Sequence, residues 1–218
     1  MNKHFILIAA LLLGSSILKA QTSQGNQTIG FNFSFNHNNY NSVAINPFDK
    51  SVTDNSSRIR IFNIGPSYSY FIADKLDLGA NLFYSSTSLS NTSNGYDPVK
   101  QYNNTYGGSI YLRKYFLYAN KIGFRTGSYV SYSIAKMNDT YVNSPNYMST
   151  TNNYGAGVNL ELVYFPSNQI GVSAMVANLG YNHYQTNNYN QGSANGDNLN
   201  FSFVNWLNLS VSYVFGDK

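Results

Sequence analysis

The stretch YGAGVNLELVY, residues 154–164, places an apolar residue at every second position. These positions are Tyr154, Ala156, Val158, Leu160, Leu162 and Tyr164. The residues between them are mostly small or polar, and one of them is the carboxylate Glu161. Because successive side chains of a β-strand point to opposite faces, the pattern predicts a strand with one apolar face and one polar face.

Similar alternation recurs along the chain and predicts seven further strands. Their expected ranges are 28–36, 58–71, 76–85, 106–115, 122–134, 170–181 and 201–215. In the second of these ranges, Pro66 lacks the N–H donor that a paired strand requires. We therefore expect a β-bulge at Pro66.

The gaps between the expected strands alternate in length. Three gaps are tight turns, at residues 73–75, 117–121 and 166–169. Four gaps are long and rich in Asn, Ser, Gly and Tyr, at residues 37–57, 86–105, 135–153 and 182–200. This arrangement is typical of outer-membrane barrels. It predicts an all-β fold, an antiparallel up-and-down transmembrane β-barrel of eight strands with short periplasmic turns and long extracellular loops. Ten strands is the alternative count.

Aromatic residues on the expected outward face gather near both ends of the strands. At the short-turn end they are Tyr68, Tyr70, Tyr164, Tyr213 and Phe215. At the long-loop end they are Tyr84, Tyr106, Tyr132 and Tyr154. Two aromatic belts fit the two interfaces of a membrane. The alternative, a secreted soluble barrel that binds a ligand inside, gives no reason for two outward belts.

The segment IGPSYSYF, residues 64–71, precedes the first tight turn. It resembles the generic outer membrane protein β-barrel domain, and the alternation over 28–215 is similar to that of the small OmpA-like and OmpX-like barrels. The resemblance implies a place in a Gram-negative type of outer membrane, in contact with outer-membrane lipid. It implies no shared activity and no shared site.

The last expected strand has apolar or aromatic residues at alternate positions, Leu207, Leu209, Val211, Tyr213 and Phe215. This pattern resembles the β-signal that closes outer-membrane barrels, and the resemblance implies recognition by the barrel-assembly machinery. The tail Gly216-Asp217-Lys218 follows the last aromatic residue, which departs from the usual pattern.

The first 20 residues predict a secretory signal peptide. Lys3 precedes nine apolar residues at positions 5–13, and Ala20 precedes a polar stretch that begins at Gln21. The apolar run is shorter than the roughly 20 residues that a spanning helix needs, and a buried N-terminal helix is the alternative. We therefore expect a signal peptide over 1–20, a short segment over 21–27, a barrel domain over 28–215 and a tail over 216–218.

The composition excludes several classes of protein. Charged residues make up only 10% of the chain, which contains 33 asparagines and no cysteine. A coiled coil needs abundant charged residues and a disulfide scaffold needs cysteines. Removal of residues 1–20 leaves eleven basic and nine acidic residues, a net charge of +2, with no basic run longer than Arg113-Lys114. We therefore expect no nucleic-acid partner.

Four charged residues fall on the expected inward face, Asp77, Arg113, Arg125 and Glu161. Each lies near a tight turn, so we expect them in one layer near the periplasmic end. A symmetric turn between the fourth and fifth strands would place the two arginines opposite each other, with Glu161 as their counter-ion and Asp77 on the other flank. The layer is either a structural plug, because side chains can fill an eight-stranded lumen, or a charged gate for small ions.

The sequence predicts no catalytic, cofactor-binding or metal site. His37 and His183 would lie beyond the outer ends of their strands, and a hydrolase would need a Ser or Asp beside such a histidine. Asp197 is present nearby, but no spacing specifies a pairing. We expect a non-enzymatic, monomeric barrel with a structural or adhesion-like surface role. A narrow porin-like channel and an outer-membrane hydrolase with a loop-borne site are the alternatives.

Overall fold

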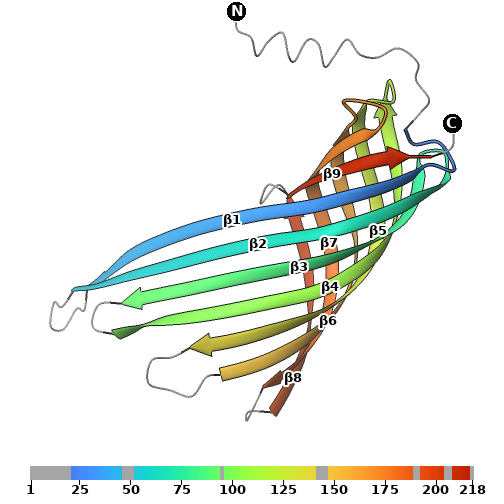
Figure 1. The fold of residues 1–218 in the computed structure, drawn as a ribbon. Helices are drawn as coiled ribbons and strands as arrows, with labels where there is room; N and C mark the ends of the chain where they lie inside the picture. The colour runs from blue at the N-terminus through green and yellow to red at the C-terminus, as the bar shows by residue number, and fades with distance from the viewer. Residues whose placement is uncertain are drawn as a thin grey trace, which may run out of the picture.

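The computed structural model describes residues 21–45, 52–93, 96–140, 147–188, 192–203 and 208–216 (Figure 1). Its regular structure consists of antiparallel strands. These are β1 (Gln27–Ile45), β2 (Val52–Ala73), β3 (Leu76–Ser93), β4 (Tyr96–Tyr118), β5 (Ile122–Thr140), β6 (Tyr147–Tyr164), β7 (Ile170–Asn188), β8 (Gly192–Phe203) and β9 (Asn208–Phe215). The signal peptide expected over residues 1–20 lies outside the described residues. Within them, the chain forms no helix with the length and apolar character to cross a bilayer.

Eight of the nine strands close into a ring. Each of β1 to β7 pairs with its neighbour in sequence, and β9 pairs with both β1 and β7. The predicted all-β, up-and-down barrel of eight strands is confirmed. The strand expected over 201–215 is divided into β8 and β9, which lie on either side of residues 204–207. Leu207 therefore falls outside the described residues.

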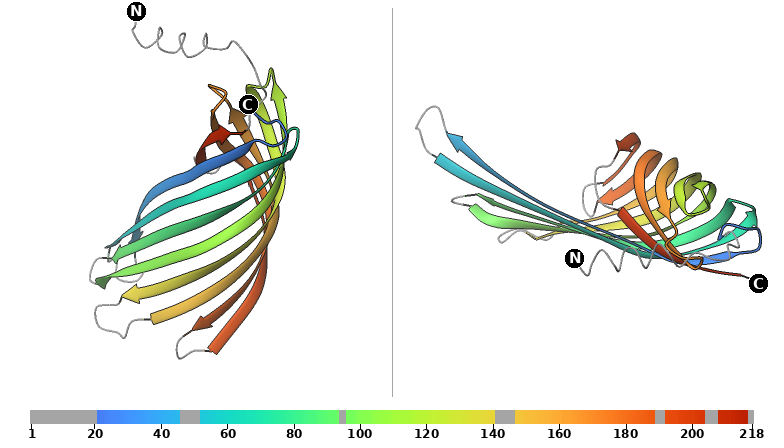
Figure 2. Two further views of the ribbon diagram at one scale, coloured as in Figure 1. Left: turned by 45° about the vertical axis from the view of Figure 1, so that its right-hand side comes forward. Right: turned by 90° about the horizontal axis from the view of Figure 1, so that it is seen from above.

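The ring is narrow at one end and spreads toward the other (Figures 1 and 2). At the narrow end, Gln27 pairs with Phe215, so the start of β1 and the end of β9 lie together there. Beyond Ser34, no pairing joins the rest of β1 to β8 in the described part of the chain. The wide end of the barrel wall is therefore open between these two strands.

The strands are longer than the sequence pattern indicates. They continue through most of the stretches expected as long loops; β1 reaches Ile45 and β4 begins at Tyr96, for example. In these extensions polar residues predominate on both faces. Backbone pairing holds the strands there, and such pairing leaves no period-two signal in the sequence.

The prediction of a β-bulge at Pro66 is wrong. Pro66 pairs with Phe31 of β1, and the β2–β3 register is the same on both sides of it. The β2–β3 ladder is interrupted between Ile64 and Ser67, which accommodates the missing donor without adding a residue. A register shift does occur in β7, where Val176 is the extra residue, so the outward face changes from Ala174 to Ala177.

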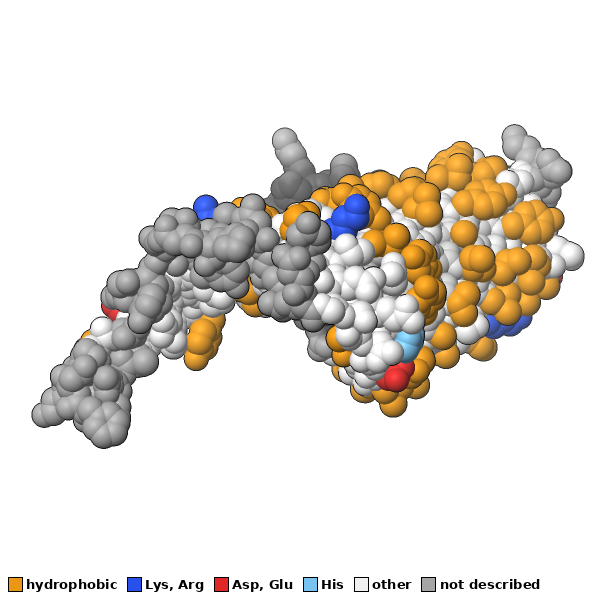
Figure 3. All heavy atoms as spheres, turned by 90° about the horizontal axis from the view of Figure 1, so that it is seen from below, with side chains coloured by type: hydrophobic (Ala, Val, Ile, Leu, Met, Phe, Trp, Pro, Cys, Tyr) orange, Lys and Arg blue, Asp and Glu red, His pale blue; other side chains and the backbone are white. Residues whose placement is uncertain are grey.

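Large apolar side chains cover the outside of the narrow part of the barrel, as the orange surface in Figure 3 shows. Exposed examples from several strands are Phe31, Leu82, Ile110, Val130, Val158 and Val211. Tyrosine rings pair on the same outer surface toward the wide end: Tyr84 with Tyr106 and Tyr132 with Tyr154, each pair at 5.1 Å between ring centroids. The apolar face of each strand is thus mainly the outward face, and Ser, Asn and charged residues make up most of the lining of the lumen cavity.

Candidate functional site: a charged layer across the lumen

The first ion pair of the layer joins β3 to β4. Asp77 and Arg113 are direct cross-strand partners. Arg113 donates from Nε to Oδ1 of Asp77 at 3.1 Å and from Nη2 to Oδ2 at 2.6 Å. Ser69 of β2 donates to the same carboxylate at 2.8 Å, and the guanidinium of Arg113 lies 3.9 Å from the centroid of the Tyr111 ring. Asp77 is fully buried and has its charge compensated by this bidentate contact.

The second ion pair joins β5 to β6. Arg125 and Glu161 are also direct cross-strand partners. Arg125 donates to Oε2 of Glu161 from Nε, at 3.1 Å, and from Nη2. The same Nη2 donates to the hydroxyl of Ser173 on β7 at 2.9 Å, and the amide of Asn159 donates to Oε1 of Glu161 at 3.2 Å. The second pair therefore connects three consecutive strands.

Tyr115 links the two ion pairs. Its hydroxyl accepts a hydrogen bond from Nη1 of Arg125 at 3.0 Å and donates one to Oδ2 of Asp77 at 3.1 Å. The structure thus brings Asp77, Arg113, Arg125 and Glu161 together in one layer, which has no net formal charge. Tyr115 was not among the residues that the sequence singled out, because nothing in the spacing indicates a hydroxyl that bridges two hairpins.

Contrary to the expectation from the sequence, Arg113 and Arg125 do not lie opposite each other. Tyr115 lies opposite Arg125, and Gly127 lies opposite Arg113. The two arginines would pair if the turn between β4 and β5 were centred on position 119, midway between them. The turn is instead centred on Asn120, and this shift of one residue moves the pairing by two residues. Ala119 and Asn120 both have positive φ angles, 47° and 54°. The offset separates the like charges and gives each arginine its own carboxylate.

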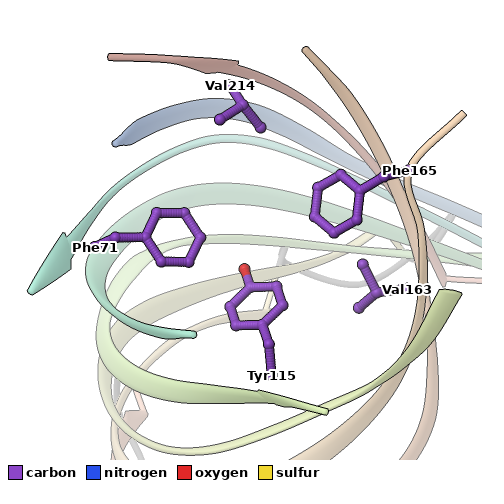
Figure 4. Packing of buried hydrophobic residues seen from close by; sticks show 5 residues of the cluster. All are labelled: Phe71, Tyr115, Val163, Phe165 and Val214. Carbon is purple, nitrogen blue, oxygen red and sulfur yellow. The ribbon is translucent and has the colours of Figure 1, made fainter. Parts of the chain in front are cut away.

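An apolar cluster fills the lumen on the narrow side of the layer (Figure 4). It consists of the buried side chains Phe71, Tyr115, Val163, Phe165 and Val214. The rings of Phe71 and Tyr115 lie 5.4 Å apart. These side chains point toward one another from strands around the ring, so the lumen is packed at this depth.

The segment before β1 reaches across the narrow mouth. The side-chain amide of Gln21 donates to Asn168, in the turn between β6 and β7, at 3.1 Å. The carbonyl of Thr22 accepts from the backbone N–H of Lys75, in the turn between β2 and β3, at 2.7 Å. Gln21 and Thr22 are both buried, so this segment adds a further cover over the apolar cluster. Its contacts join distant parts of the chain and have no sequence signal.

On the wide side of the layer the lumen holds a polar cavity of about 450 Å³. Arg113, Arg125 and Glu161 are part of its lining, whereas Asp77 and Tyr115 are not. Most other lining residues carry amides or hydroxyls, among them Asn32, Asn63, Asn81, Ser109, Asn178 and Ser210. The cavity therefore meets the charged layer and does not extend past it.

The sequence specified no partner for His183, and the structure places one beside it. Nδ1 of His183 on β7 lies 3.0 Å from Oδ1 of Asp197 on β8, and the hydroxyl of Tyr181 donates to the same oxygen at 2.5 Å. Nε2 of His183 lies 3.4 Å from the side-chain amide of Gln185. In the described residues, no serine hydroxyl is bonded to His183, and no group of three potential metal ligands occurs.

No protein-family model and no curated protein matches the chain. Solved structures that resemble it include the N-terminal β-barrel domain of OprF from Pseudomonas aeruginosa, with 15% identity, 88% of this chain and 98% of that chain covered, and a TM-score of 0.36. The outer membrane protein OprG from the same organism has 13% identity; the match covers 91% of this chain and 100% of that chain, with a TM-score of 0.41. Ail, the attachment invasion locus protein of Yersinia pestis, has 15% identity; the match covers 88% of this chain and 99% of that chain, with a TM-score of 0.34. These neighbours are small outer-membrane β-barrel proteins, and the likeness to them is one of architecture.

Proposed function

We propose that this protein is an integral outer-membrane β-barrel with a closed lumen, without enzymatic activity, and with a structural or adhesion-like role at the cell surface. The single observation that carries this proposal is that the barrel has an apolar outer surface together with a lumen that side chains fill at its narrow end. The proposal includes export through the signal peptide over 1–20, recognition of residues 207–215 by the barrel-assembly machinery, and a monomeric state.

The outer surface supports the placement in lipid. Side chains such as Leu82 and Ile110 are 66% and 58% exposed, respectively, on the outside of the ring. In water, exposure of so many large apolar side chains would favour aggregation, whereas a lipid surround removes that cost. Strand pairing around the narrow part satisfies the backbone N–H and C=O groups internally, as the hydrocarbon core requires.

The narrow end supports a lumen that does not conduct. Water or ions in the polar cavity would have to pass the ion pairs, the ring of Tyr115 and then the packed rings of Phe71 and Phe165. The cavity itself favours the alternative of a narrow channel, because its polar lining resembles the start of an aqueous path. That alternative requires the layer and the apolar cluster to move aside together.

The wide end supports a surface role. The outer part of β1 has an unpaired edge in the described residues, and an exposed strand edge is a template for pairing with another chain. A hydrolase finds less support. The contact between His183 and Asp197 would orient a histidine, but a nucleophile is absent from its hydrogen bonds in the described part of the chain.

Three experiments test the proposal, the first and third on the purified protein and the second on cell fractions. The band on a denaturing gel should shift between unboiled and boiled samples, and the protein should fractionate with outer membranes. In planar bilayers it should show no steady channel current, whereas the double variant Phe71→Ala/Tyr115→Ala should conduct. A soluble protein without a gel shift would contradict the membrane barrel. A steady current in the unmodified protein would contradict the closed lumen and support the channel.

A further inference from the structure

Basic side chains gather on the outward face of the strands just beyond the outer tyrosine pairs. Arg58 and Arg60 lie on β2, Lys100 on β4 and Lys136 on β5, and all four are exposed. The register aligns Arg60 with Ser88 on β3 and, across it, with Tyr102 on β4; Arg58 is aligned with Ser90 and Lys100 in the same way. These residues occupy the same alternate positions as the outward-facing Tyr84 and Tyr106, so they lie on the face turned away from the lumen.

Part of this basic group forms a surface cavity of about 230 Å³. Its lining consists of Arg58, Arg60, Ser88, Ser90, Lys100 and Tyr102. It thus combines three cations with three hydroxyl groups, and none of the described residues in its wall is a carboxylate. Arg58 donates from Nε to the side-chain oxygen of Asn39 at 3.2 Å, which holds its guanidinium on this face. The three cations share one cavity wall and repel one another, so an anion in the cavity would be stabilising.

The carboxylates that the structure places by side chain do not line this cavity. On β2, Asp54 lies four residues beyond Arg58 and is not part of the cavity lining. Asp77 and Glu161 are committed to the ion pairs of the lumen, and Asp197 contacts His183 and Tyr181. Among the residues whose side chains the structure describes, the positive charge of the cavity is therefore not compensated.

The position of the cavity points to a lipid as the source of the anion. Ser88 lies four residues beyond Tyr84 on β3, which corresponds to roughly 13 Å along the strand and, at a tilt of about 45°, to roughly 9 Å along the membrane normal. When the tyrosines lie at the interface, the cavity lies at the outer side of the headgroup layer, where a headgroup that extends away from the bilayer reaches it. Below the cavity, the same face presents the exposed apolar side chains of Phe62, Leu82 and Ile110.

We propose that this outward cavity binds a phosphate group of an anionic lipid of the outer leaflet, with the acyl chains of the lipid against the apolar surface below it. The inference rests on the membrane placement proposed above. The arginines supply planar, multi-donor groups suited to phosphate, and Lys100 adds a point charge. A phosphorylated glycolipid has the required combination of phosphate, hydroxyl-rich headgroup and acyl chains.

The test compares two variants that each lose three positive charges. Arg58→Ser/Arg60→Ser/Lys100→Ser removes the cations of the cavity. Lys75→Asn/Lys114→Ser/Lys121→Ser is the control at the narrow end, with Asn at position 75 because Lys75 has a φ of 60°. Native mass spectrometry in micelles measures binding of diphosphoryl lipid A, a phosphorylated glycolipid, to each protein. Inorganic phosphate is titrated as a separate competitor.

We expect the cavity variant to bind lipid A more than about tenfold more weakly than the unmodified protein, and the control to bind normally, because each basic residue near a charged lipid surface contributes substantially to affinity. Unchanged binding by the cavity variant, or equal losses in both variants, would overturn the proposal. Competition by inorganic phosphate at concentrations equal to those of lipid A would overturn the assignment to a lipid. The gel shift on boiling is recorded for every sample, so that a failure of the barrel proposal is recognised separately.

Discussion

Tyr115 lies directly opposite Arg125 in the β4–β5 hairpin, and its hydroxyl accepts a hydrogen bond from Nη1 of Arg125 at 3.0 Å. The same hydroxyl donates to Asp77 at 3.1 Å, so one side chain couples the two ion pairs of the lumen. The ring beneath this hydroxyl packs with Phe71 in the apolar cluster. Tyr115 is therefore the residue at which the charged layer and the apolar seal meet.

Tyr115→Phe should keep the apolar seal and weaken the charged layer. The substitution removes the hydroxyl that accepts from Nη1 of Arg125 and donates to Oδ2 of Asp77. We therefore expect a loss of about 1–3 kcal/mol in the free energy of unfolding. Urea unfolding in lipid vesicles, followed by the gel shift, measures this loss. Tyr118→Phe is the matched control, because Tyr118 is 82% exposed and should tolerate the change. Equal stability of the two variants would show that the bridging hydroxyl has no structural role.

Asp77→Asn should destabilise the barrel more than removal of the whole pair. The single variant leaves Arg113 charged and buried without its carboxylate, and we expect a loss of about 3–5 kcal/mol in unfolding free energy. The double variant Asp77→Asn/Arg113→Gln should recover part of this loss, because it removes the unpaired charge. Asp197→Asn breaks the exposed contact with His183 and should cost less than about 1 kcal/mol. Additive effects of the two lumen substitutions would contradict the coupling.

Gly79→Ala should destabilise the barrel through the ring of Tyr111. A methyl group at position 79 would lie 2.6 Å from that ring and 2.5 Å from the side chain of Ser69. Displacement of Tyr111 would also disturb Arg113, which lies over its ring, and we expect a loss of about 1–3 kcal/mol. Gly108→Ala is the control, because its closest contacts are 3.0 and 3.2 Å. Thermal unfolding of both variants in detergent measures the difference, and a larger loss at Gly108 would refute this packing argument.

The sequence predicts the part of the barrel in which the two faces of a strand have different surroundings. In β6, the residues from Tyr154 to Tyr164 alternate because the outward face is apolar and the lumen face is polar. The same alternation and the nearby turns put Asp77, Arg113, Arg125 and Glu161 on the inward face. Their exact pairing depends on the centre of one turn, at Asn120, which the alternation does not determine.

Three features have no local pattern to reveal them. The strand extensions beyond the tyrosine pairs have polar residues on both faces, so they resemble loops in sequence. The register shift at Val176 changes which face of β7 is outward without any Gly or Pro at that position. The contacts of Gln21 and Thr22 across the narrow mouth join segments that are far apart in the chain.

The orientation of the barrel wall is tested most directly by the environment of two consecutive residues on β4. Ile110 is 58% exposed on the outer surface, whereas Ser109 lines the polar cavity of the lumen. Because the chain contains no cysteine, Ile110→Cys and Ser109→Cys each provide a single site for a nitroxide label in vesicles. With the apolar face toward lipid, oxygen, which concentrates in lipid, should relax the label at position 110, and a water-soluble nickel chelate should relax the label at position 109. The reverse pattern would show that the apolar face is the interior, and would contradict the membrane barrel.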